Sequence, residues 1–204
     1  MATNYIILMF KSRNKDNKNV PNFTKRETFK VVPTSDIKVD YEEMYLEYRD
    51  EFYEFVTQGV TGETSRMYCS INVADGKKVS EKISHFALDF LLKCDIISLR
   101  DKLSAKIVRE CMKKENKVKE TRWMLDIDSE DDIKWVDKCF KDDPYMTDAL
   151  VVWSSYTPNG KHVILRKPEN QLEWAFINKI VQGGDDITLK KDDLYLLEAI
   201  TKEE

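Results

Sequence analysis

The chain has 204 residues, enough for one well-buried core with a small elaboration and short for two full domains. Hydrophobic residues make up 42% and charged residues 34% of it, a balance that excludes most disordered and membrane-spanning chains. The formal net charge of −4 argues against a protein that coats nucleic acid by bulk attraction.

The sequence contains no apolar run near the ~20 residues that span a bilayer, and its first residues lack the pattern of a secretion signal. We therefore expect a cytoplasmic protein with no membrane partner. Cys69, Cys94, Cys111 and Cys139 lie far apart and form no Cys-x-x-Cys pair. This spacing favours reduced core thiols over a metal cluster or a disulfide framework.

The N-terminal third predicts a strand, a loop and a helix in that order. Residues 5–10 are an apolar run of strand length, whereas residues 11–39 are polar, lysine-rich and contain Pro21 and Pro33, which favours a loop. Asp40 and Glu43 have the spacing of a helix N-terminus, and helical spacing of apolar residues continues until Gly59.

The middle of the chain predicts a strand followed by two amphipathic helices. Residues 66–73 alternate in polarity, which is typical of a half-buried strand that shows a polar face. Helical spacing then recurs over residues 79–91 and 99–112. The outer face of the second helix is basic, and basic residues outnumber acids as far as Arg122. From Asp126 to Asp143 acids outnumber bases.

The C-terminal part predicts a strand, a helix, a hairpin, a second helix and two short strands. Residues 122–128 alternate, and Ser129 caps a helix that reaches Phe140. Strands at 149–153 and 161–166 flank the turn residues Pro158, Asn159 and Gly160. A capping box at residues 170–173 begins a helix that ends at 183–184, and strands follow at 187–189 and 194–200.

Together these elements predict an α+β fold, a single compact domain with an antiparallel or mixed sheet flanked by helices. Residues 1–65 would form an N-terminal elaboration of strand, loop and helix. Residues 66–204 would form the core that carries the functional residues.

Asp126 and Asp128 are the first candidate site. Two residues apart on a strand, they project from one face about 6–7 Å apart at the backbone. Like charges so placed raise each other's pKa unless a cation intervenes, and hard oxygen ligands at this spacing suit Mg²⁺ or Mn²⁺. Arg122 on the same face would neutralise phosphate or pair with the acids. The simpler interpretation is a charged strand end that runs into a solvated acidic helix.

Other uses of an Asp-x-Asp pair fit less well. A calcium loop would have glycine at its sixth position and glutamate at its twelfth, where this chain has Asp131 and Asp137. A haloacid-dehalogenase-type phosphatase would have threonine or valine at the position of Glu130. A sugar transferase stays open, although nothing else in the sequence supports it.

His162 is the second candidate, since it follows the tight turn and shares a strand face with Arg166. A neutral imidazole there would donate to a phosphate oxygen, helped by Lys161 and by the backbone amides of residues 159–161. Any one of four late acids would complete a carboxylate set, although aspartate is also common in surface turns, where its role is structural. The four are Asp185, Asp186, Asp192 and Asp193.

The order of a strand-borne Asp-Ile-Asp, then Gly160-Lys161-His162 on a returning hairpin, then a late aspartate resembles the archaeo-eukaryotic primase and primase–polymerase superfamily. Segments 66–72, 122–128 and 157–165 also resemble small phage-encoded proteins with this fold. The resemblance covers about residues 66–200 and implies an RRM-like palm. For a phage protein, it implies the cytoplasm of a bacterial host.

The resemblance implies specific roles. Asp126, Asp128 and a later acid, Asp192 in preference to Asp186, would bind catalytic Mg²⁺ or Mn²⁺, and His162 would contact the phosphates of the incoming nucleotide. Lys161, Arg166 and Arg122 would assist in nucleotide binding. The chain departs from the family at Gly160, where a small hydroxyl residue is usual, and it has neither a zinc cluster nor a helicase module.

We therefore expect a metal-dependent nucleotidyltransferase that acts on single-stranded or primed nucleic acid, with nucleoside triphosphates as substrates and replication proteins as further partners. Two surfaces are candidates for the template. They comprise the strand face of Arg66, Tyr68 and Asn72 and the helix face of Lys106, Arg109, Lys113 and Lys114.

Two rival functions stay open at this point. The first is a non-catalytic protein on the same fold, which would bind nucleic acid, a nucleotide or a partner protein. The small size, the acidic net charge and the missing hydroxyl residue favour it. A metal-dependent nuclease would use the same acids.

Overall fold

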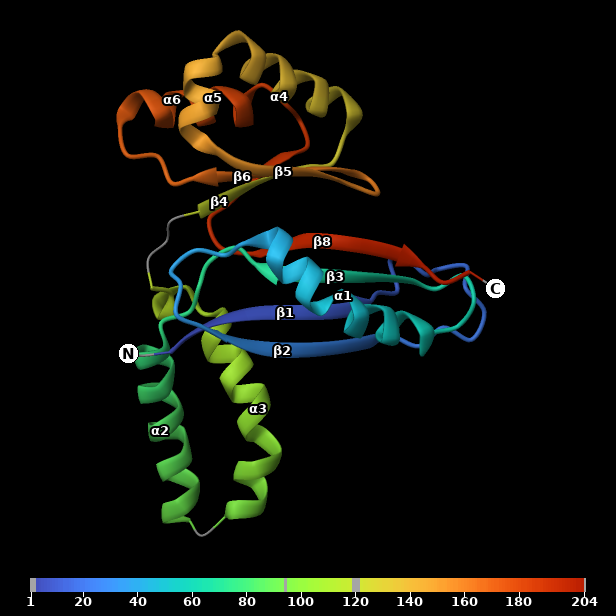
Figure 1. The fold of residues 1–204 in the computed structure, drawn as a ribbon, viewed down its shortest axis with the longest axis vertical. Helices are drawn as coiled ribbons and strands as arrows, with labels where there is room; N and C mark the ends of the chain where they lie inside the picture. Colours follow the sequence, from blue (N-terminus) through green and yellow to red (C-terminus); the bar gives the residue numbers. More distant parts are fainter. Residues whose placement is uncertain (1–2, 94, 119–121, 204) are drawn as a thin grey trace. The chain divides into compact units, whose positions relative to one another are not determined.

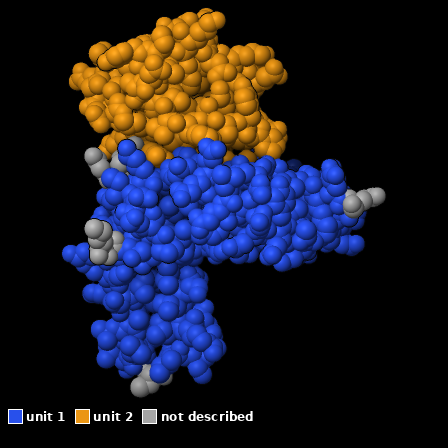
Figure 2. Space-filling model, in the orientation of Figure 1, with its two compact units in different colours: residues 1–119, 197–204 blue, residues 120–196 orange. Residues whose placement is uncertain are grey.

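The computed structural model describes residues 3–93, 95–118 and 122–203. It has the predicted α+β fold, with two four-stranded sheets. The chain divides into two compact units, which Figure 2 colours separately: unit 1 is Met1–Lys119 with Leu197–Glu204, and unit 2 is Glu120–Leu196. This division differs from the expected boundary at residue 65, because strands from the first 65 residues pair in the same sheet as the strand that follows them.

Unit 1 is built on a sheet with the strand order β2-β1-β3-β8 (Figure 1). Its strands are β1 (Asn4–Ser12), β2 (Arg26–Thr34), β3 (Thr64–Ser70) and β8 (Leu194–Thr201), whose first residues belong to unit 2. β1 pairs antiparallel with both β2 and β3. Helix α1 (Tyr41–Thr57) begins as predicted, with Asp40 Oδ1 accepting from the amide of Glu43 at 3.0 Å.

Two expectations for this unit are wrong. The lysine-rich segment is not all loop, since residues 26–34 form the edge strand β2 with Pro33 opposite Tyr5. Proline is tolerated there because an edge strand leaves one row of N–H groups without a ladder partner. Strand β3 shows no polar face either. It lies inside the sheet, and every residue after Thr64 is buried.

The two amphipathic helices of unit 1 form a hairpin. Helices α2 (Gly76–Leu92) and α3 (Ile96–Met112) run side by side away from the sheet (Figure 1). Their base joins the core through Val79 and Cys111, which cluster with Ile7 of β1. A short 3₁₀ turn, η1 (Lys114–Asn116), follows α3.

Unit 2 has a β-α-β-β-α-β topology. Its elements are β4 (Arg122–Ile127), α4 (Glu130–Asp142), α5 (Pro144–Leu150), β5 (Val151–Thr157), β6 (Gly160–Arg166), α6 (Gln171–Gln182) and β7 (Ile187–Lys190). The sheet order is β5-β6-β4-β7, and each neighbouring pair is antiparallel. This is the ferredoxin-like arrangement, in which the first and third strands lie at the centre.

The helices of unit 2 cover one face of its sheet (Figure 1). Leu125 and Ile127 of β4 and Val163 and Leu165 of β6 are buried in a common core with residues of α4 and α6. Alternation therefore directs Asp126 of β4 and His162 of β6 to the opposite face of the sheet. This alternation decides which side of the sheet carries the polar residues.

The sequence signals for the ends of these elements are confirmed. The Ser129 hydroxyl accepts from the amide of Asp132 at 3.1 Å, and Asn170 Oδ1 accepts from the amide of Glu173 at 3.0 Å. Thr157 pairs with Gly160 across the predicted turn. Sequence patterns did not indicate α5, which begins with proline in its first turn.

Cys69, Cys111 and Cys139 are free and buried, as expected, whereas Cys94 lies outside the described residues. Burial raises the pKa of Cys111 to about 11, so this thiol stays protonated at neutral pH. Within the described part of the chain, no helix is both long and apolar enough to cross a membrane.

Candidate functional site

Asp126 and His162 are direct cross-strand partners at the centre of the unit 2 sheet. In the register of β4 and β6, Asp126 lies opposite His162, and His162 Nε2 donates to Asp126 Oδ1 at 2.9 Å. Both side chains are largely buried, with 17% and 12% of their surface exposed. The structure thus brings together two of the residues that the sequence predicts, from strands that are distant in sequence.

Lys190 occupies the other oxygen of the Asp126 carboxylate. Its Nζ lies 2.7 Å from Asp126 Oδ2 and 3.1 Å from Asp193 Oδ2. The hydrogen bond from His162, joined by that from Lys190, outweighs burial and holds the pKa of Asp126 well below its usual range. Burial would lower the pKa of Lys190, but its bonds to the two carboxylates raise it. Asp126 is therefore a permanently charged acceptor between two protein donors.

His162 also borders an aromatic and hydroxyl cluster. Its ring lies 5.7 Å from that of Tyr195, which donates to the Ser155 hydroxyl at 2.5 Å and accepts from Trp153 Nε1 at 2.7 Å. Ser155 lies directly opposite His162 in the pairing of β5 with β6. Burial raises the pKa of Tyr195, so its hydroxyl keeps its proton.

The second ring nitrogen of His162 has no hydrogen-bond partner among the residues that the structure describes, and it is buried. Because Nε2 donates to Asp126, the neutral imidazole would carry an acceptor at Nδ1. Donation to a phosphate oxygen, as the sequence predicts for His162, therefore requires either that Nε2 leave Asp126 or that the ring be protonated.

Asp128 lies one residue beyond the end of β4 and is exposed. Its amide donates to the carbonyl of Asp186 at 3.2 Å, which continues the pairing of β4 with β7 by one residue. Asp186 is exposed too, whereas Asp192 lies past the far end of β7. Of the two late acids named for the third position, Asp186 is thus the one whose backbone lies beside Asp128.

These acids do not form a ready metal centre. Within residues 3–93, 95–118 and 122–203, no group of three or more histidine, cysteine, aspartate or glutamate side chains is arranged to hold a metal ion. Carboxylate oxygens are suitable donors for Mg²⁺ and Mn²⁺, but both oxygens of Asp126 already face protein donors.

The structure gives a steric reason for glycine at position 160. A Cβ at this position would lie 1.9 Å from the carbonyl oxygen of Ile127 and 3.1 Å from the Cα of Asp128. No side chain fits so close to the backbone of the neighbouring strand. The hydroxyl nearest to His162 in the strand register is instead that of Ser155.

The predicted phosphate-binding cations do not gather at His162. Lys161 is buried, and its Nζ lies 2.6 Å from Asp137 Oδ1 on helix α4. Arg166 bonds the carbonyl of Ala149 at 3.0 Å and Glu173 Oε1 at 2.8 Å, which fastens the end of β6 to the start of α6. Arg122 pairs with Arg166 in the strand register, four residues and about 13 Å along the sheet from Asp126.

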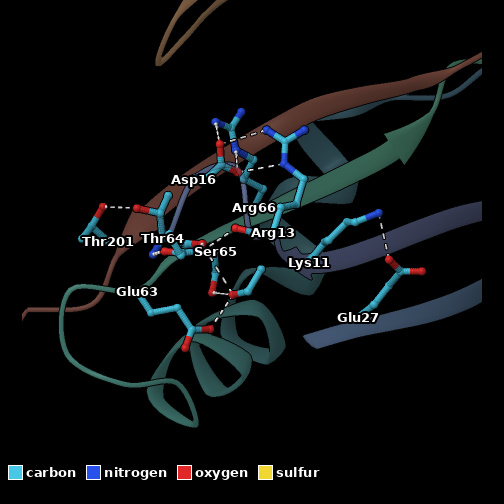
Figure 3. Close-up of polar contacts among 11 residues, drawn as sticks. Lys11, Arg13, Asp16, Glu27, Glu63, Thr64, Ser65, Arg66 and Thr201 are labelled. Carbon is cyan, nitrogen blue, oxygen red and sulfur yellow. Dashed lines mark hydrogen bonds and ion pairs between the residues drawn. The ribbon is translucent and has the colours of Figure 1, made fainter. Parts of the chain in front are cut away.

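The strand candidates for template binding are also engaged within the fold. Figure 3 shows Asp16 between two arginines, Arg13 and Arg66, and Arg66 donates to both of its oxygens at 2.9 and 2.8 Å. Arg66, Tyr68 and Asn72 are all buried, which contradicts the exposed polar face that sequence alternation predicts. The alternation is misleading here because the segment after β1, which carries Asp16, pairs with Arg66 on the face that the sequence predicts to be exposed.

The helix candidates divide into anchored and exposed residues. Lys106 and Lys113 lie 2.8 and 2.9 Å from Glu110 Oε1, and Glu110 is buried with 1% of its side chain exposed. Burial alone would raise the pKa of Glu110, but its hydrogen bonds with Lys106, Lys113 and Asn116 lower it to about 2. Arg109 and Lys114 are exposed on this part of the chain.

Sequence reasoning missed Lys190 and Tyr195 as members of the site. A lysine at the end of a short strand gives no local sign that it reaches a buried aspartate on the neighbouring strand. The pairing of β7 with β4 would have shown it, but sequence alone does not fix strand register.

Comparison with known proteins gives no further guide, since no protein-family model, no curated protein and no solved structure matches this chain. The sequence resemblance and the geometry of unit 2 are therefore what bears on function.

Proposed function

We propose that the chain is a nucleotidyltransferase of the primase–polymerase type, which adds nucleotides to single-stranded or primed nucleic acid. The observation that carries the proposal is the contact of Asp126 with His162. These residues lie on the two central strands of a β-α-β-β-α-β sheet, on the face that its helices leave uncovered. The sequence resemblance implies that a strand-borne aspartate and a histidine on the following hairpin act in one nucleotide site.

Asp126 and Asp128 would hold Mg²⁺ or Mn²⁺, with Asp186 favoured over Asp192 as the third acid because its backbone bonds that of Asp128. A metal held by these acids would supply activation of the attacking hydroxyl and stabilisation of the leaving pyrophosphate. His162 would orient the nucleoside triphosphate once its Nε2 proton is released from Asp126, and the hydroxyl of Ser155 lies opposite it to assist.

A second candidate is a non-catalytic protein that binds a nucleotide or nucleic acid on the same fold. Lys190 favours this candidate, because its ammonium group occupies the position on Asp126 where a metal would be expected. In a protein that has lost catalysis, such an internal cation would replace the metal and keep the buried carboxylate paired.

Nucleotide incorporation on primed and unprimed single strands with Mn²⁺ tests the enzyme. We expect extension by the wild type and none by the Asp126→Ala, Asp128→Ala double variant. Asp142→Asn, at an exposed acid at the end of α4, is the matched control and should keep full activity. Shortening of a labelled strand without nucleotides would instead indicate the metal-dependent nuclease.

Lys190→Met separates the two candidates. If Asp126 is a metal ligand, removal of the competing ammonium should tighten Mn²⁺ binding, measured by calorimetry, by about tenfold or more. If Lys190 has permanently replaced the metal, the variant should bind Mn²⁺ no better than the wild type and should lose stability. Nucleotide binding that is unaffected by a chelator and occurs without turnover would also favour the binding protein.

A further inference from the structure

The loop between β1 and β2 concentrates positive charge in an acidic chain. We call residues 13–25 the basic loop; it is closed by Ser12 and Arg26, which pair in the strand register. The loop holds four bases and one acid, which are Arg13, Lys15, Lys18 and Lys25 against Asp16. It therefore has a surplus of three positive charges, whereas the whole chain has a net charge of −4.

The charged residues that flank the basic loop leave this surplus unchanged. Lys11 Nζ lies 2.8 Å from Glu27 Oε2, and Arg26 pairs with the buried carboxylate of Glu63. Lys25 Nζ also approaches Glu27, at 3.7 Å, but that carboxylate is already paired with Lys11. Each flanking pair contributes one base and one acid, so the surplus lies in the loop itself.

Buried side chains hold the basic loop in one shape. Asn17 Oδ1 accepts from the amide of Thr64 at 2.6 Å, and Asn17 Nδ2 donates to the carbonyls of Thr64 and Arg13 at 3.0 Å each. Asp16 accepts from Arg13 and Arg66, each of which donates through Nε and Nη2 (Figure 3). A loop fixed in this way loses little conformational entropy when its cations bind a ligand.

The same contacts leave several cations of the loop facing solvent. Asn17 is buried and the Asp16 side chain is 7% exposed, whereas the lysines on either side of them, Lys15 and Lys18, are exposed. Neither lysine makes an ion pair with any residue that the structure describes. Arg13 gives one edge of its guanidinium to Asp16. Because a guanidinium has five N–H donors in a fixed fork, its other edge is suited to two oxygens of one phosphate group.

The exposed residues of the basic loop indicate the kind of partner that it fits. They are three lysines, three asparagines, Thr24 and Pro21. Protein interfaces are poor in lysine and depend on large aromatic or apolar anchors, and segments that lie on membranes insert apolar side chains. The loop exposes no such side chain. Lysine, asparagine and threonine side chains are instead typical contacts of phosphates and sugars in nucleic acids.

We propose that the basic loop binds the phosphate backbone of single-stranded nucleic acid. The choice of a single strand rests on the function proposed for the chain, whereas the binding itself needs neither metal nor nucleotide. The basic loop would then take the role that the sequence assigns to Arg66, Tyr68 and Asn72, which are buried. Among these, Arg66 acts indirectly, because it holds Asp16 and so positions the loop.

Fluorescence anisotropy of the full chain with a labelled single strand of about 20 nucleotides, from roughly 25 to 200 mM salt and without metal or nucleoside triphosphate, tests the proposal. We expect the Lys15→Gln, Lys18→Gln double variant to bind about tenfold more weakly at low salt. The slope of log affinity against log salt concentration should fall by about 1.4, since each phosphate contact on a single strand contributes about 0.7. Strands of different sequence should be affected equally, because phosphates carry no sequence information.

Two further variants control for charge and for folding. Lys138→Gln with Lys179→Gln removes two positive charges at exposed lysines of α4 and α6. It should change the affinity by less than about twofold, because exposed charges away from the bound strand are screened. Lys15→Arg with Lys18→Arg should bind as the wild type does. All three should keep the circular dichroism and thermal midpoint of the wild type, since every changed residue is exposed.

Three results would overturn the proposal. The first is a wild type that does not bind the strand, and the second is equal weakening by the loop variant and the Lys138, Lys179 control, which would indicate bulk charge alone. The third is cosedimentation with phosphatidylserine vesicles by a wild type that does not bind the strand, lost in the loop variant, which would assign the loop to a lipid surface.

The Asp126→Ala, Asp128→Ala double variant separates strand binding from catalysis. It should bind the strand as the wild type does, although it should not incorporate nucleotides. A wild type that binds through the basic loop without incorporation would contradict the enzyme and support the loop. Incorporation by a loop variant whose strand affinity is unchanged would contradict the loop and support the enzyme.

Discussion

Asp126 shows how a single carboxylate links the candidate site to the stability of the fold. Its pKa is depressed by donors that exist in the folded state alone, so it stabilises the protein above its unfolded pKa of about 3.9. That stabilisation is lost as the pH falls below about 3.9 toward the lower pKa of the folded state. A site residue with this property contributes to folding whether or not it binds a metal.

We predict that Asp126→Asn lowers the free energy of unfolding by about 2 kcal/mol at pH 7, because Lys190 and His162 lose a charged acceptor. The difference between the variant and the wild type should shrink as the pH falls from about 4, where the wild-type carboxylate begins to lose its advantage. Urea denaturation across this pH series measures it. A difference that does not change with pH would mean that the ionisation of Asp126 is not linked to folding.

Glycine is required at position 160 because the backbone of the neighbouring strand lies too close for a side chain. We predict that Gly160→Ser destabilises the protein by about 3 kcal/mol or prevents folding, because the new Cβ would clash with the backbone carbonyl of Ile127. The serine would introduce a small hydroxyl residue at this turn, yet it should not raise activity. Thermal unfolding of the variant is the measurement, with Ser154→Ala on the exposed part of β5 as control. A stable variant with increased incorporation would show that the hydroxyl belongs there.

At the scale of elements, the sequence correctly predicted the helix caps and the turn, which depend on residues close together in the chain. The caps at Asp40, Ser129 and Asn170 and the turn at residues 157–160 are each set by neighbours in sequence, and each is confirmed. The sequence resemblance named Asp126 and His162 as residues of one candidate site. Their exact register followed from strand pairing, which the hydrophobic pattern does not determine.

The incorrect or missing predictions of elements have one cause in common. Strand β2 was missed because a polar edge strand with Pro33 reads as a loop, and the polar face of β3 was misplaced because the partner of Arg66, Asp16, lies far away in sequence. Lys190 was missed for the same reason. The positions of β2, of the polar face of β3 and of Lys190 each depend on contacts between segments far apart in the chain. Hydrophobic periodicity, in contrast, describes one segment at a time.

At the base of the α2–α3 hairpin, the buried carboxylate of Glu110 pairs with Lys106 and Lys113. We predict that Glu110→Gln lowers the free energy of unfolding by about 2 kcal/mol at pH 7, because Lys106 and Lys113 lose their shared partner near the end of α3. The wild type should lose this contribution as the pH falls from about 4.3 toward 2, because the folded pKa is about 2. Denaturation at a series of pH values checks it. Glu115→Gln, at an exposed acid of η1, should have no such effect.

At the scale of the whole molecule, composition and length predicted a globular α+β chain, and a single core was the natural expectation. Among the described residues, one hydrophobic cluster lies on Leu125, Val163 and Ile177 and another on Ile7 and Val79, and the two belong to different compact units. The chain leaves unit 1 before β4 and returns to it within β8. Such an insertion leaves no compositional mark, because both units use the same residue types.

This organisation predicts that residues 122–196 fold without the rest of the chain. The segment contains the complete β-α-β-β-α-β topology and its own core, but with roughly 75 residues it should be stable by only about 3–5 kcal/mol. A fragment that ends at residue 191 should be less stable, because it lacks Tyr195, which bonds Trp153 and Ser155, and Asp193, which pairs with Lys190. Urea denaturation of both fragments, followed by circular dichroism, measures the difference. An unfolded longer fragment, together with a single unfolding transition of the full chain by every probe, would show that the two units fold as one.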